Sequence, residues 1–261
     1  MAQSVARFSS RVENYIRYRP GYPAAIIALL KEECGLTPRA IVADIGSGTG
    51  KLSELFLKNG NEVLGIEPNA AMREAAERIL ETFSGFRSVD GTAEATSLAS
   101  ASVDFVTAGQ AFHWFDPTKA KKEAARIIKP EGWAVLIWNE RHLDTTPFLR
   151  EYEQFLLRFG TDYQDVRHEN AVEAISKFFA PEDVRLQSFA NAQDFNFEGL
   201  MGRVLSSSYI PEPEHPNFES MLQSLKEIFD RHQIDGRIRF DYETRVYYGH
   251  LSYKPDLEQR N

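Results

Sequence analysis

A loop with three glycines in five residues lies in the first third of the sequence. It reads VADIGSGTGKLS over residues 42–53. In α/β enzymes, a glycine loop between a strand and a helix lets the backbone approach a phosphate, a nucleotide or another cofactor. Several unrelated enzyme classes use such a loop, so the residues around it have to indicate the ligand.

Two kinds of phosphate-binding loop do not match. The ATPase loop needs a glycine five residues before its Gly-Lys pair and a serine or threonine after the lysine, where this chain has Ile45 and Leu52. A dinucleotide loop reads Gly-x-Gly-x-x-Gly, whereas this loop reads Gly-x-Gly-x-Gly. The charge of Asp44, just before the loop, would repel a pyrophosphate and attract an ammonium or sulfonium group. We therefore expect a ligand that carries positive charge.

A second acid, Glu67, closes the next apolar run of the chain. In open α/β sheets, an acid at this position accepts hydrogen bonds from ribose hydroxyls. The alternative is a solvated carboxylate at the end of a strand. The spacing from the glycine loop favours the ribose role.

The elements that must position these residues follow an alternating pattern. Short apolar runs alternate with amphipathic segments over the first 150 residues, which predicts βαβ units and a parallel sheet. Helices are expected to begin at Pro23 and Lys51 and after the caps Asn69 and Asp116, with the helix after Asn69 continuing to Gly85. A turn, KPEG, is expected at 129–132. The expected strands are 40–46, 62–67, 85–90, 102–108 and 132–138.

The pattern changes after Asn139. Residues 145–180 and 217–233 are predicted to be helical, 184–197 to be a strand, and 237–251 to be a long strand or a hairpin. An aromatic set recurs at near-helical spacing, which favours core packing over a ligand site. Its members are Phe148, Tyr152, Phe155 and Phe159.

Composition is that of a globular protein without a nucleic-acid surface. The 261 residues are 43% hydrophobic and 26% charged, with a net charge of −8 and no cluster of basic residues. The single cysteine, Cys34, is expected to be a buried structural thiol. The six histidines, His168 among them, lack metal-site spacing, so no metal is predicted. We expect no nucleic-acid partner and either a monomer or a homodimer.

No membrane segment is expected. The longest apolar run, residues 24–30, is too short to cross a bilayer, and the opening MAQSVARFSSR lacks the apolar stretch of a secretory signal. These observations predict a cytoplasmic location.

The motifs together resemble the class I S-adenosylmethionine-dependent methyltransferases. VADIGSGTG resembles their first motif, GIEPNAAM (65–72) their second, and GTAEATSL (91–98) the segment that lies against the adenine. ARIIKPEGWAVLI resembles their last helix, turn and fifth strand. The resemblance covers about residues 36–140. It implies an α/β fold: a Rossmann-like, doubly wound, seven-stranded sheet, mostly parallel with one antiparallel edge strand, plus a helical cap insertion.

The resemblance also implies S-adenosyl-L-methionine as cofactor and a role for each matching residue. Asp44 would lie near the methionine ammonium, Glu67 would hold the ribose, and Arg19 would pair with the methionine carboxylate. The alternative for YRPGYP, which contains Arg19, is a rigid turn between two helices. The remaining residues would shape the pocket: Gly46, Ser47 and Gly48 at the backbone, Met72 and Ala93 on either side of the adenine, Glu94 at its edge, and Gln110 beside the methionine.

A narrower resemblance concerns the methyl acceptor. FSSRVENYIRYRPGYP (8–23) and AGQAFHWFD (108–116) are similar to the trans-aconitate methyltransferase-like group, which implies a small carboxylate acceptor. His113 and Trp114 would then orient an acceptor that is already ionised. If the acceptor is a hydroxyl, His113 could be a general base. In the alternative interpretation, His113 forms a hydrogen bond with a backbone group, and the aromatic residues beside it belong to the core. The corresponding position in that group more often carries glutamine, which leaves the substrate open.

The expected organisation has three parts: cap helices over 1–35, the cofactor-binding core over 36–140, and a helical insertion with C-terminal strands over 141–261. The predicted function is methylation of a small molecule, with a carboxylate oxygen as the favoured acceptor. The alternatives are a cofactor-binding protein without turnover, an NAD(P) oxidoreductase, which Asp44 disfavours, and a methyltransferase for a hydroxyl, carbon or macromolecular acceptor.

Overall fold

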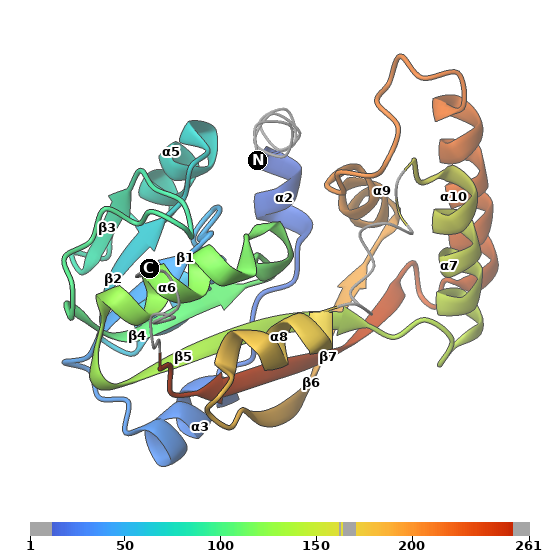
Figure 1. Ribbon diagram of the computed structural model, residues 1–261. Coiled ribbons are helices and arrows are strands. Elements are labelled where there is room, and N and C mark those ends of the chain that lie inside the picture. The colour runs from blue at the N-terminus through green and yellow to red at the C-terminus, as the bar shows by residue number, and fades with distance from the viewer. Residues whose placement is uncertain (1–11, 162, 164–170, 253–261) are drawn as a thin grey trace, which may run out of the picture. The chain divides into compact units, whose positions relative to one another are not determined.

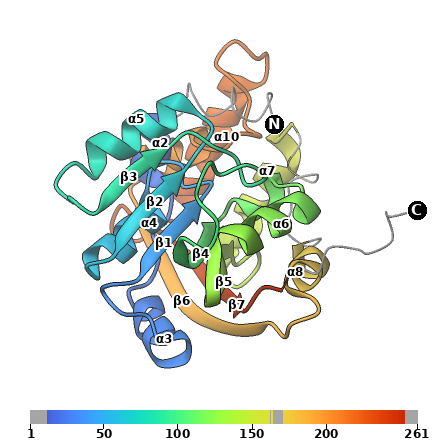
Figure 2. The same ribbon diagram turned by 60° about the vertical axis from the view of Figure 1, so that its left-hand side comes forward.

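Seven strands form one mixed sheet. The computed structural model describes residues 12–161, 163 and 171–252. In chain order the strands are β1 (Ile41–Ile45), β2 (Glu62–Ile66), β3 (Phe86–Val89), β4 (Val103–Gly109), β5 (Ile128–Arg141), β6 (Arg185–Phe195) and β7 (Ile238–Gly249). Their order in the sheet is β3-β2-β1-β4-β5-β7-β6, mostly parallel with one antiparallel edge pair (Figures 1 and 2). The fold class expected from the sequence is confirmed.

The strand order reverses beside β1. This strand pairs in parallel with β2 on one side and with β4 on the other, so that Asp44 faces Gly65 and Thr107 in register. In open parallel sheets, ligands bind at the carboxyl ends of the strands where the order reverses. The glycine loop begins directly after β1, at that end of the sheet.

The helices among the described residues follow the predicted pattern for most of the chain. They are α2 (Val12–Tyr18), α3 (Ala25–Cys34), α4 (Lys51–Lys58), α5 (Ala70–Ile79), the short η1 (Phe112–Trp114), α6 (Pro117–Ile127), α7 (Pro147–Phe159), α8 (Ala171–Phe179), α9 (Phe197–Leu205) and α10 (Phe218–His232). The side chain of Asn69 accepts a hydrogen bond from Met72 N, and that of Asp116 from Lys119 N. Both predicted caps are therefore confirmed. None of these helices is long and apolar enough to cross a membrane.

Three local predictions are wrong. α5 ends at Ile79 rather than near Gly85, because two tight turns, Phe83 N to Leu80 O and Phe86 N to Phe83 O, lead the chain into β3. Residues 129–132 lie inside β5 as an irregularity against β4, since Val103 pairs with Ile128 and Phe105 with Trp133. Helix α9 lies where no helix was predicted.

The chain divides into two compact units, each with its own core. Unit 1 comprises residues 1–23, 139–168 and 188–244, and unit 2 comprises 24–138, 169–187 and 245–261. Strands β5, β6 and β7 have residues in both. The core of unit 2 gathers apolar side chains of the sheet with those of α6 and α8. The division into 1–35, 36–140 and 141–261 stays a prediction.

The core of unit 1 is rich in aromatic residues. Helix α7 packs against α10, and α2 packs against α9. The rings of Phe148 and Tyr152 meet the edge of Phe240 at centroid distances of 5.0 and 4.9 Å. The whole aromatic stripe of α7 is buried, so the prediction that it packs in a core is confirmed.

Candidate functional site

The three glycines of the loop serve different purposes. All have positive φ: +68° at Gly46, +55° at Gly48 and +81° at Gly50. A Cβ at Gly46 would come within 2.6 Å of Ala111 Cβ, and one at Gly50 within 2.5 Å of Leu80 Cδ1, whereas one at Gly48 would meet no atom within 4 Å. Gly46 and Gly50 are therefore required by packing, and Gly48 borders open space that a ligand can approach.

The backbone amides of the loop are already engaged. Gly46 N and Ser47 N donate to Ile66 O at 2.8 and 3.1 Å, and Gly50 N donates to Ser47 O at 2.9 Å. Gly48 N donates to Glu67 Oε2 at 3.0 Å. A phosphate-binding loop instead directs its N–H groups at the ligand. This loop suits a ligand that packs against the backbone without needing those amides.

Glu67 connects the end of β2 to both neighbouring turns. Its Oε1 accepts from Asn69 N at 2.9 Å while its Oε2 accepts from Gly48 N. Burial raises the pKa of Glu67, although the two amide bonds and nearby Arg73 oppose the shift. A carboxylate has about four lone-pair sites, so capacity remains for further donors. The two hydroxyl groups of a ribose could donate hydrogen bonds to the Glu67 carboxylate.

Asp44 lies fully buried at the end of β1. Ser53 Oγ donates to its Oδ2 at 2.7 Å, and Thr107 Oγ1 lies 3.4 Å from its Oδ1. Burial raises the pKa of Asp44 to about 7 and the charge of Glu67 contributes in the same direction, against the bonds from Ser53 and Thr107. Sequence reasoning missed Ser53 and Thr107. Thr107 could not have been found without the register between β1 and β4, and the role of Asp44 toward an ammonium group stays a prediction.

The residues expected around an adenine are ordered and mostly buried. Met72, in the first turn of α5, and Ala93 are each 4% exposed. Glu94 Oε1 accepts a hydrogen bond from Asp116 N at 2.8 Å, which links the segment after β3 to the start of α6. Their contacts with a ligand stay predictions.

The segment after β4 is held against the glycine loop. Gln110 has a φ of +55°, which is uncommon outside glycine, and its N donates to Ile137 O at 2.9 Å. Ala111 is the residue that a Cβ at Gly46 would strike. The turn at 110–111 therefore packs directly on the loop after β1.

His113 and Trp114 form the short helix η1 just beyond this turn. His113 is exposed, Trp114 is half-buried, and their ring centroids lie 4.6 Å apart. Phe112 belongs to the core, with Phe178 at a centroid distance of 5.0 Å. The residues after the core Phe112 are thus at least partly accessible to solvent, while the roles of His113 and Trp114 toward an acceptor stay predictions.

Arg19 lies in unit 1. Its Nη2 donates to Ser206 O at 3.0 Å and to Ser207 Oγ at 3.2 Å, and its guanidinium lies 5.4 Å from the ring centroid of Tyr15. Its expected role toward the methionine carboxylate stays a prediction. The two serines and the neighbouring Arg203 were not among the expected functional residues.

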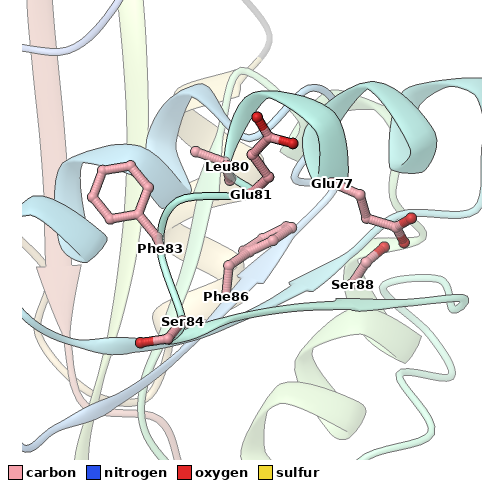
Figure 3. A pocket seen from close by; sticks show the side chains of 7 residues that line it. All are labelled: Glu77, Leu80, Glu81, Phe83, Ser84, Phe86 and Ser88. Carbon is pink, nitrogen blue, oxygen red and sulfur yellow. The ribbon is translucent and has the colours of Figure 1, made fainter.

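Two other features of the described residues offer no alternative site. No group of three or more His, Cys, Asp or Glu side chains could hold a metal ion in the part of the chain that is described, and His168 lies outside it. A hollow of about 400 Å³ lies between α5 and β3. Figure 3 shows the side chains that line it: Glu77, Leu80, Glu81, Phe83, Ser84, Phe86 and Ser88. Its two carboxylates would repel an anionic acceptor.

Several known proteins that this chain resembles are named as methyltransferases. The methyltransferase domain family matches residues 43–136. An uncharacterized methyltransferase of Schizosaccharomyces pombe is 27% identical over 247 residues, 92% of this chain and 95% of that protein. An uncharacterized methyltransferase of Mycobacterium tuberculosis is 34% identical over 158 residues, 60% of this chain and 62% of that protein.

Two solved structures share the fold. A candidate type II methyltransferase of Anaeromyxobacter dehalogenans has a TM-score of 0.66 at 19% identity, with 89% of this chain and 97% of that chain covered. The YcgJ protein of Bacillus subtilis has a TM-score of 0.56 at 20% identity, with coverage of 87% and 98%.

Proposed function

We propose that this chain, which is a class I S-adenosylmethionine-dependent methyltransferase, methylates a carboxylate oxygen of a small molecule. The observation that carries the proposal is the packing of Ala111 on Gly46. This contact joins the loop on the cofactor side to the segment of His113 and Trp114, which we assign to the acceptor. Reactant and methyl donor have to be aligned for in-line displacement, and a fixed distance between their binding segments serves that alignment.

The residues around the glycine loop fit the cofactor. Open space over Gly48 accommodates close approach to the backbone, and Glu67 retains lone pairs for ribose hydroxyls. Burial raises the pKa of Asp44 to about 7, and once ionised it would carry a negative charge suited to an ammonium or sulfonium group. We further propose that Met72 and Ala93 enclose the adenine, Glu94 lies at its edge, Gln110 lies beside the methionine moiety, and Arg19 pairs with the methionine carboxylate.

When bound, S-adenosylmethionine supplies a methyl group on a positively charged sulfur, which a nucleophile can displace. The chain then has to orient the acceptor and exclude water. A carboxylate is ionised at neutral pH and needs no base, so His113 and the indole N–H of Trp114 would act as donors that orient it. A hydroxyl acceptor would instead require His113 to remove a proton.

Two binding titrations test the cofactor. Wild type is expected to bind S-adenosylhomocysteine at micromolar concentration, and Asp44→Ala and Glu67→Ala are expected to bind it at least about tenfold more weakly. Absence of binding by folded wild type would refute the assignment of the site.

Methyl transfer to a metabolite mixture tests the acceptor. With cofactor labelled in the methyl group, a carboxyl methyl ester releases labelled methanol in mild alkali, whereas an ether or a methylated carbon does not. Alkali-labile product supports the carboxylate proposal. Alkali-stable product favours a hydroxyl or carbon acceptor, and cofactor binding without any product favours a protein that binds without turnover.

A further inference from the structure

Two arginines in unit 1, the buried Arg203 and the half-buried Arg19, share one hydroxyl group. Arg203, on α9, is 6% exposed, and its Nη1 donates to Ser207 Oγ at 3.2 Å. Arg19 Nη2 donates to the same oxygen, also at 3.2 Å. A single serine oxygen therefore holds two guanidinium groups close together, which is unfavourable for like charges in a buried setting.

The pair has no carboxylate partner among the described residues. In the same unit, Arg141 forms an ion pair with buried Glu153, and Tyr163 donates to that carboxylate. In contrast, the Nε atoms of Arg19 and Arg203 are both buried and have no acceptor within the described chain. Burying a charge without a counterion costs several kcal/mol even after relaxation. An anionic ligand would offset that cost.

Tyrosine hydroxyls complete the surroundings of the pair. Tyr152 is 1% exposed and its hydroxyl has no partner in the described structure. Burial by itself would raise the pKa of Tyr209, but the charges of Arg203 and Arg19 and a hydrogen bond from Ser207 lower it. Burial lowers the pKa of Arg19, and the positive charge of Arg203 adds to that effect. Tyr209 and Arg19 thus both respond to the positive charge of Arg203.

We propose that Arg19 and Arg203 form a binding site for a carboxylate group, with the Tyr152 hydroxyl as an additional donor. The planar guanidinium presents N–H donors in a fork that matches a carboxylate, and each Nε–H here still lacks an acceptor. A carboxylate adds one negative charge to two positive charges and so relieves their repulsion without over-neutralising the cluster.

Two molecules could bring the carboxylate. One is the methionine moiety of the cofactor, for which Arg19 was expected from the sequence. The other is the methyl acceptor, and this source rests on the proposed function. A carboxylate held by two guanidiniums is stabilised and therefore a weaker nucleophile, so in the acceptor it would be an anchor separate from the oxygen that is methylated. The acceptor would then be a dicarboxylate or a higher carboxylate.

The test replaces Arg203 by an apolar side chain of similar length in the full chain. Arg203→Met is expected to fold, because replacing an unpaired buried charge by a packed apolar chain is often neutral or stabilising. Arg158→Gln removes an exposed charge from the same unit and is the matched control. Binding of four ligands is measured by calorimetry. Two are S-adenosylhomocysteine and methylthioadenosine, the second of which lacks the amino-acid part. The other two are glutarate and its neutral dimethyl ester.

Either of two outcomes supports the site. If the acceptor is the source, Arg203→Met binds glutarate at least about tenfold more weakly than wild type, and the dimethyl ester binds neither protein. If the cofactor is the source, Arg203→Met binds S-adenosylhomocysteine at least about tenfold more weakly but binds methylthioadenosine as wild type does. The Arg158→Gln control retains wild-type affinities in both cases.

Three outcomes would overturn the site. In the first, folded Arg203→Met binds glutarate and S-adenosylhomocysteine as wild type does. In the second, it loses as much affinity for methylthioadenosine as for S-adenosylhomocysteine. In the third, wild type binds inorganic phosphate but neither glutarate nor S-adenosylhomocysteine. If Arg203→Met does not fold, Arg203→Gln is measured in the same way. If wild type binds methylthioadenosine but transfers no methyl group from S-adenosylmethionine, the proposed function is contradicted. The carboxylate site is not affected by that result, since the carboxylate titrations do not depend on turnover.

Discussion

The backbone amide of Gly48, in the loop after β1, donates a hydrogen bond to the carboxylate of Glu67 at the end of β2, with a distance of 3.0 Å. The glycine that borders open space and the acid expected to hold a ribose are thus one connected unit. The bond fixes the loop after β1 to the end of β2, so we expect cofactor binding to require little reorganisation at this edge.

Replacing Glu67 by glutamine is expected to weaken cofactor binding more than it weakens the fold. The amide keeps one acceptor oxygen but cannot serve both Gly48 N and Asn69 N and two ribose hydroxyls. We expect affinity for S-adenosylhomocysteine to fall at least about tenfold. Glu62→Gln, on the same strand and outside the loop, is the control. Equal affinities for Glu67→Gln and wild type would refute the ribose role.

Alanine substitutions at the loop glycines should separate packing from binding. At Gly46 the added methyl strikes Ala111, so Gly46→Ala is expected to lower the free energy of unfolding by about 2–4 kcal/mol. At Gly48 the backbone strain of about 1–2 kcal/mol is the main cost to stability, but the methyl enters the space assigned to the ligand. Urea unfolding and calorimetry would measure both effects. Cofactor binding by Gly48→Ala at wild-type affinity would contradict the assignment.

The raised pKa of Asp44 predicts a pH-dependent difference in stability between wild type and Asp44→Asn. Between the ordinary aspartate value, about 4, and about 7, the folded chain keeps a proton that the unfolded chain has lost. Wild type therefore loses stability as pH rises through this window, by up to about 4 kcal/mol. The advantage of Asp44→Asn should grow from pH 4 to 7 and then stay constant.

Urea unfolding of the two proteins at pH 5, 6, 7 and 8 measures this difference. Parallel pH curves for wild type and Asp44→Asn would show that the carboxyl of Asp44 is not perturbed in the folded state.

His113→Gln distinguishes an orienting side chain from a general base. If His113 only orients a carboxylate, kcat/KM should fall by about tenfold or less, and by the same factor at every pH between 6 and 8, because the titration of Asp44 affects both proteins alike. Loss of a general base typically costs about 100- to 10,000-fold and removes the rising limb of the profile near the pKa of histidine. Such a loss would indicate that the acceptor is a hydroxyl rather than a carboxylate.

Local signals in the sequence were sufficient for most elements of unit 2. The caps Asn69 and Asp116, the glycine that ends α3 and the apolar strands act through contacts within a few residues, so pattern and propensity reveal them. Helix α9 was missed because its two glycines disfavour a helix. Gly202 is required there by tertiary packing, since a Cβ would collide with the ring of Tyr18 on α2.

The sequence by itself determined the α/β class, the glycine loop after the first strand, the acids at 44 and 67, and a cofactor of positive charge, because these depend on residue type and short spacing. Only the tertiary structure decided which amides the loop has already used, that Thr107 meets Asp44, and that Arg19 and Arg203 share Ser207 with no carboxylate partner among the described residues. Apart from the Arg203–Ser207 bond, which spans four positions, the residues in these contacts lie 19 to 188 positions apart. Contacts at such separations follow from strand register and core packing, which no local pattern encodes.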